Sequence, residues 1–332
     1  MTYALLVASF ALLLGGALVF TNAVEWAGAR MSLGTGAVGS LLAAVATALP
    51  ESLVPIIALL SGSQESEAVA IGAIVGAPFL LGTLAMALVG VAAFGFKERR
   101  EQDEHLAHHR PTLVRDLVFF LLFLGAALVL GIVGTRPLRI AAAVVFVAAY
   151  AVYVWRSVAG GGESDEEEEL APLYVDPSKK DPPSTWQIVL QTAAGVAAIA
   201  FGAHLFVDEV THLAESLGVT PLVLALVLAP VATELPEKFN SFIWMREGKD
   251  ELALGNITGA MVFQSTLPVA VGLAFTSWSF DVYPILACAF ALAGGALALW
   301  AGADRRRFGP FPVGAWAGLF VAFVLVVVFT AG

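Results

Sequence analysis

Two short stretches of this sequence place a glutamate directly after a proline in the middle of an apolar run. They read TALPE at residues 47–51 and TELPE at residues 233–237. A carboxylate at the centre of a membrane costs roughly 2.5–3.5 kcal/mol, so it is rare where no function requires it. Threonine lies one helical turn before each glutamate, and proline frees a backbone carbonyl. Such oxygen ligands suit hard cations, for example Ca²⁺, and the candidates are Thr47, Glu51, Thr233 and Glu237.

Each motif is followed by a pair of glycines four residues apart. Gly-Ala-Ile-Val-Gly occupies residues 72–76, and Gly-Asn-Ile-Thr-Gly occupies residues 255–259. Upstream, Glu25 and Glu209 each precede a Leu-Gly pair by the same distance. The chain is therefore predicted to be an internal duplication of membrane-spanning units.

The composition indicates a multi-pass membrane protein. Of 332 residues, 59% are hydrophobic and the mean hydropathy is +0.85, well above a soluble domain. The net charge of −10 comes partly from an acidic run at residues 163–169, which indicates a linker and no nucleic-acid partner. The single cysteine, Cys288, excludes an intrachain disulfide.

Apolar runs of helical length predict an all-α polytopic membrane protein with ten transmembrane helices, arranged as two inverted five-helix repeats. The first repeat covers residues 1–157, an acidic cytoplasmic linker covers 158–185, and the second, inverted repeat covers 186–332. The expected spans are about 3–28, 36–61, 68–95, 113–134, 138–157, 186–212, 219–245, 252–277, 282–302 and 310–331.

Basic residues predict the orientation in the cell membrane. Of the 17 lysines and arginines, only Arg136 and Arg139 fall on one side of the ten-span arrangement, and Lys238 falls inside a span. The positive-inside rule then places both termini outside and the linker in the cytoplasm. Five spans in each half invert the second half, an architecture typical of alternating-access transporters.

The paired motifs, the five-plus-five layout and the Gly-Asn-Ile-x-Gly after the second glutamate resemble the repeats of the calcium/cation antiporter superfamily, that of the sodium/calcium exchangers. The resemblance covers nearly the whole chain. It implies antiport of a divalent cation, most often Ca²⁺, for Na⁺ or H⁺ without a cofactor. By position it implies ligands at Thr47, Glu51, Thr233 and Glu237, and it places Leu81 and Gln264 at a further ligand position.

The chain also departs from that pattern, and the departures concern the counter-ion. Apolar residues replace family oxygen ligands at Ala48, Ala77, Leu81 and Ala260. Glu234 adds a third carboxylate near the site, which favours protons, or fewer sodium ions, as the counter-ion. The alternative is that Lys238, four residues later, neutralises Glu234 and excludes it from transport.

Other readings remain open on the sequence alone. An exchanger for Mg²⁺ or Mn²⁺, or a cation channel or uniporter on the same fold, fits the same residues. An intramembrane hydrolase is disfavoured, because the acids lack a nucleophile motif or a His/Cys ligand cluster, so the chain is predicted not to be an enzyme. The oligomeric state and the roles of Glu25 and Glu209 are not indicated.

The predicted topology can be checked by labelling. A cysteine introduced as Asp165→Cys should stay protected from an impermeant thiol reagent in intact cells, whereas cysteines added at the termini should react, because the basic residues place the linker inside. Labelling at position 165 from outside, with the termini protected, would reverse the assignment.

Overall fold

In the computed structural model, every secondary-structure element among the described residues is a helix. The described residues are 2–30, 48–96, 110–159, 170–176, 183–302 and 308–330; for residues 49, 158–159 and 235–237 only the backbone is described. The helices are α1 (Thr2–Arg30), α3 (Leu49–Ser61), α4 (Gln64–Leu80), the π-helical segment η1 (Leu81–Ala85), α5 (Met86–Gly95), α6 (Arg110–Val133), α7 (Arg136–Ala159), α8 (Thr185–Leu217), α9 (Pro221–Thr233), α10 (Leu235–Arg246), α11 (Asp250–Gln264), α12 (Leu267–Phe275), α13 (Val282–Gly302) and α14 (Pro310–Thr330).

Within the described ranges, eight helical stretches are long and apolar enough to cross a membrane, and two shorter apolar helices, Pro50–Ser61 and Pro221–Thr233, accompany them. Large apolar side chains such as Leu122, Phe201 and Val328 are exposed on the outer helices, as expected for surfaces that face lipid. The prediction of a multi-pass membrane protein is thus confirmed. The count of ten spans stays a prediction, because one of the two remaining spans, 219–245, is divided into α9 and α10 and the other begins outside the described residues.

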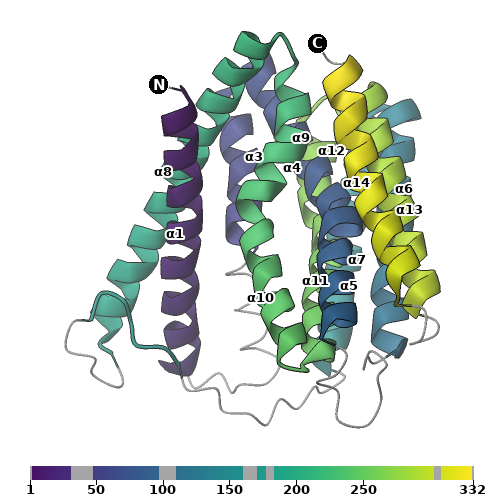
Figure 1. The fold of residues 1–332 in the computed structure, drawn as a ribbon. Helices are drawn as coiled ribbons and strands as arrows, with labels where there is room; N and C mark the ends of the chain where they lie inside the picture. The colour runs from purple at the N-terminus through teal and green to yellow at the C-terminus, as the bar shows by residue number, and fades with distance from the viewer. Residues whose placement is uncertain are drawn as a thin grey trace.

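The helices form one bundle in which α1 lies along α8, beside the remaining helices (Figure 1). Both ends of the described chain lie at the same end of the bundle, and residues 170–176 lie at the opposite end (Figure 1). This segment is tied to the α1–α8 pair: Trp26 Nε1 donates to the carbonyl of Ala171 (2.9 Å), and the Val175 amide donates to Gln191 Oε1 (2.9 Å). Which end faces the cytoplasm stays a prediction.

Two of the long spans lose regular α-helical geometry at corresponding positions of the duplicated pattern. In the first half, the π-helical segment begins at Leu81. In the second half, α11 ends at Gln264, and Thr266 adopts φ −123° and ψ −75° before α12 begins. Irregular backbone inside a membrane bundle is tolerated where protein buries it, and π-helical turns often mark functional sites. The irregularities therefore point to the region around Leu81 and Gln264.

The glycines of the first Gly-x-x-x-Gly pattern allow α4 to approach α9 backbone to backbone. A Cβ atom at Gly72 would lie 2.5 Å from the Leu222 carbonyl oxygen, and one at Gly76 would overlap the Leu226 carbonyl oxygen. Small residues at helix contacts are a common means of close packing in membranes. This contact holds α9, which leads into the second motif, against α4, which follows the helix of the first motif.

We predict that Gly76→Ala lowers stability by about 1–3 kcal/mol, because the new methyl group would force α4 away from α9. The matched control is Gly314→Ala on α14, where no described atom lies within 4 Å of the added Cβ. Thermal unfolding of the two purified variants in the same detergent measures the difference. Equal melting temperatures would show that the α4–α9 contact tolerates a side chain.

Candidate functional site

The second motif interrupts its helix at Glu234. The amide of Glu234 still donates to the Pro230 carbonyl (2.8 Å), but Pro236 has no amide hydrogen to continue the pattern. As a result α9 ends at Thr233, and α10 begins at Leu235. Glu234 lies at the junction, where its side chain is fully buried.

The Glu234 carboxylate is held by two partners from different helices. Its Oε1 accepts a hydrogen bond of 2.6 Å from Gln264 Nε2, at the end of α11. Its Oε2 lies 3.3 Å from Lys238 Nζ, one turn along α10, and neither side chain of this ion pair is exposed to solvent. The neutralising partner considered from the sequence is therefore present, and Glu234 is nevertheless bonded into the centre of the bundle.

The first motif reaches the same place from α3. The carboxyl group of Glu51, in the first turn of α3, is a side-chain hydrogen-bonding partner of the Glu234 carboxyl group. Two carboxyl groups in contact repel each other when both are ionised, so a proton or a nearby cation makes their proximity more favourable. The structure thus brings residues of both motifs together at a position suited to positive charge.

Further polar residues lie at the helix ends next to Glu234 and Gln264. Gln264, Ser265 and Thr266 form the interruption between α11 and α12 and are buried. Pro268 leaves the Gln264 carbonyl without the amide that a regular helix would supply. Thr233 is 8% exposed, and its hydroxyl donates to the Ala229 carbonyl (3.2 Å), so its oxygen lone pairs remain able to accept or to coordinate a cation.

The remaining predicted ligands are only partly placed. Thr47 lies outside the described residues, and for Glu237 the backbone alone is described, at the start of α10. Across the described part of the chain, no group of three or more His, Cys, Asp or Glu side chains is arranged to hold a metal ion. The described carboxylates of the site are therefore Glu51 and Glu234, and the third candidate is Glu237.

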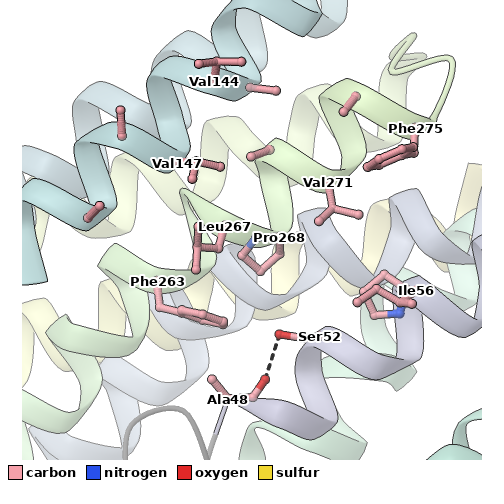
Figure 2. A pocket seen from close by; sticks show the side chains of 16 residues that line it. Ala48, Ser52, Ile56, Val144, Val147, Phe263, Leu267, Pro268, Val271 and Phe275 are labelled. Carbon is pink, nitrogen blue, oxygen red and sulfur yellow. Dashed lines mark hydrogen bonds between the residues drawn. The ribbon is translucent and has the colours of Figure 1, made fainter. Parts of the chain in front are cut away.

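An apolar cavity of about 720 Å³ lies between α3, α7 and the α11–α12 pair. Figure 2 shows Ser52 at its edge, with its hydroxyl bonded to the Ala48 carbonyl (2.9 Å), facing Phe263 and Pro268. Apart from this hydroxyl, its lining is almost entirely apolar, including Val144 and Val147 of α7. A cation would lose hydration there without gaining ligands, so the cavity is not the cation site.

The chain matches the family model described as "Sodium/calcium exchanger protein" over residues 1–159 and 188–331. It belongs to the sodium/calcium exchanger family. Members of this family are transporters, so the predicted superfamily and the prediction that the chain is not an enzyme are both confirmed.

Two relatives match this exchanger-family chain over short segments. It is 32% identical to the putative antiporter CaxA of Alkalimonas amylolytica over 30% of its own length and 32% of that protein. It is 39% identical to the sodium/calcium exchanger MaX1 of Methanosarcina acetivorans over 20% of its own length and 19% of that protein. The matches to these relatives thus span a third of their length or less.

Solved structures share the fold over nearly the whole chain. An H⁺/Ca²⁺ exchanger named CAX superposes with a TM-score of 0.68 at 19% identity, covering 99% of this chain and 82% of CAX. The sodium-calcium exchanger NCX_Mj superposes with a TM-score of 0.60 at 20% identity, covering 98% of each chain. These likenesses establish the exchanger fold.

A polar cluster that the sequence interpretation missed supports the site helix α11 of this exchanger-family protein. Buried Asp116 on α6 accepts hydrogen bonds from Thr258 Oγ1 (2.9 Å), Tyr153 OH (3.0 Å) and Arg115 Nε (3.0 Å). Thr258 belongs to the Gly-Asn-Ile-Thr-Gly segment. The available signal was an acid in an apolar span, but its partners on other helices could not be inferred from spacing.

We predict that Thr258→Val lowers stability by about 1.5–3 kcal/mol, because it removes a buried hydrogen bond to a carboxylate. Thr211→Val is the control. Among the described residues, the Thr211 hydroxyl donates to the Val207 carbonyl of its own helix (2.8 Å), and loss of this bond should change stability by about 0.5 kcal/mol or less. Thermal unfolding in detergent compares them. Equal losses would remove Asp116 as a support of α11.

Proposed function

We propose that this protein is a secondary active antiporter that exchanges a divalent cation, Ca²⁺ in the first place, for Na⁺ or H⁺. The observation that carries the proposal is the meeting of the two motifs, in which Glu51 of the first contacts Glu234 of the second. Membership of the sodium/calcium exchanger family supports it. In this proposal residues 1–157 and 186–332 are the two inverted five-helix halves, and 158–185 is the cytoplasmic linker between them.

The named residues have distinct roles in this proposal. Glu51 and Glu237 each supply half of the charge that compensates a divalent cation at the bilayer midplane. Thr47 and Thr233 contribute hydroxyl oxygens, and the Gln264 amide fixes Glu234 and offers its own oxygen. The helix interruptions at Glu234 and at residues 265–266 allow small rotations that open the site to one side at a time.

The proposal for the counter-ion rests on oxygen ligands that are missing around this site. Leu81 and Ala77 are buried with apolar side chains at positions where relatives are expected to carry oxygen ligands. Fewer oxygen atoms favour protons, or fewer sodium ions than usual. Both kinds of coupling occur among structures of this fold, since CAX is titled an H⁺/Ca²⁺ exchanger and NCX_Mj a sodium-calcium exchanger.

The decisive measurement is Ca²⁺ uptake by vesicles that contain the purified protein, with Na⁺ and pH gradients imposed separately. Wild type should accumulate Ca²⁺ against its gradient, and Glu51→Gln should reduce uptake by about 100-fold or more, because a neutral amide cannot compensate a divalent charge in a desolvated site. Mg²⁺ and Mn²⁺ as competitors identify the preferred ion.

Glu215→Gln is the matched control, since Glu215 is exposed near the end of α8 and its loss removes the same charge away from the site. It should transport like wild type. Ca²⁺ flux that never exceeds the equilibrium distribution would indicate a channel or uniporter. Normal uptake by Glu51→Gln would remove Glu51 from the site.

A further inference from the structure

The buried lysine of α10 is a charge that the proposed transport reaction does not use. Lys238 has a fully buried side chain, and its ammonium lies 3.3 Å from Glu234 Oε2. Lysines near the ends of membrane helices usually extend to the interface, where water solvates the ammonium. Lys238 is instead directed toward the point where α9, α10 and α11 meet.

Stability does not explain this arrangement well. A buried ion pair has a desolvation cost that often equals or exceeds its attraction, and an apolar pair of similar volume is commonly as stable. The same helix turn would accommodate methionine or leucine in a membrane bundle. A lysine that contacts the glutamate at the centre of the site therefore calls for an explanation in terms of charge at the site.

The charge inventory of the two motifs supplies that explanation. In the proposed site Glu51 and Glu237 balance a divalent cation, Glu234 adds a third carboxylate, and Lys238 adds one ammonium. The difference is two negative charges, which a single divalent cation neutralises. Without the ammonium, the same set would hold an additional negative charge and would require a monovalent cation besides the divalent one.

We propose that the Lys238 ammonium is a tethered cation: it occupies beside Glu234 the position that a monovalent cation would otherwise take. The site is thereby limited to two exchangeable positive charges. Gln264 holds the other Glu234 oxygen by a 2.6 Å hydrogen bond, so the carboxylate stays oriented toward the ammonium. The inference rests on the proposed function in that it takes this cluster to be the cation site, but it concerns binding and not transport.

The test measures equilibrium binding of radioactive sodium to purified protein, together with melting temperatures in Na⁺ and in N-methyl-D-glucamine. At a pH high enough to keep Glu234 deprotonated, the Lys238→Met variant should gain a saturable Na⁺ site that binds at least about tenfold more tightly than any in wild type, because the buried carboxylate then needs a cation to compensate its charge. Na⁺ should also raise its melting temperature more than that of wild type.

Two matched variants separate a charge effect from a packing effect. Lys238→Arg keeps the positive charge and should gain no Na⁺ site. Glu234→Gln combined with Lys238→Met removes both charges and should gain none either, although it has the same methionine. If Lys238 is only a structural contact, Lys238→Met should melt at a lower temperature than the double variant. Na⁺ should then raise the melting temperatures of the two variants equally, and that result would contradict the proposal.

If Lys238→Met cannot be purified without Na⁺, recovery in Na⁺ alone supports the proposal. If Lys238→Met cannot be purified in either medium although the double variant folds, the proposal is contradicted. These outcomes are independent of the vesicle assay. If Lys238→Met gains a Na⁺ site but wild type takes up no Ca²⁺, the tethered cation is supported and the proposed exchange is wrong. If wild type takes up Ca²⁺ but Lys238→Met gains no Na⁺ site, only the tethered cation is wrong.

Discussion

The cost of placing charge in a low-dielectric interior is the constraint on which the rest of this structure depends. Glu234, Lys238 and Gln264 are buried; Glu234 forms an ion pair with Lys238 of α10 and accepts a hydrogen bond from Gln264 of α11. Such a cluster is stable only when each charge has a partner at close range. The helices must therefore converge at one point, and the backbone must turn there to bring side chains from separate spans into contact.

The interruptions in the helices serve this convergence. Pro236 and Pro268 lack amide donors, so regular helical hydrogen bonding is interrupted between α9 and α10 and between α11 and α12, where the polar side chains gather. The glycines of α4 let that helix lie against the backbone of α9. Close packing and helix interruptions therefore act together. The packing against α4 fixes the position of α9, and the interruption after Thr233 makes the end of α9 accessible to α3 and α11.

The sequence was sufficient to predict the membrane class, the duplicated motif and the exchanger superfamily, because hydropathy and motif spacing are local properties. It also proposed Glu51, Thr233, Glu234 and Gln264 as site residues, and the structure places these residues at or next to helix ends. It could not choose a role for Lys238, since spacing alone allows the lysine to face an acid or the interface. Nor could it find the bond between Asp116 and Thr258, because helix-to-helix contacts arise from the tertiary arrangement.

The departures of this chain from its family have a common direction. Buried apolar residues, Ala77 and Leu81, remove oxygen atoms that would bind further cations, and Lys238 places a fixed positive charge beside Glu234. In the proposed cation site, both changes would lower the number of mobile cations that can be held. A substitution that removed oxygen ligands without removing negative charge would leave a buried carboxylate uncompensated, and a lysine added to a complete ligand set would repel the substrate. The loss of oxygen ligands and the presence of a buried lysine therefore compensate each other: the lysine balances the carboxylate that fewer bound cations would leave unpaired.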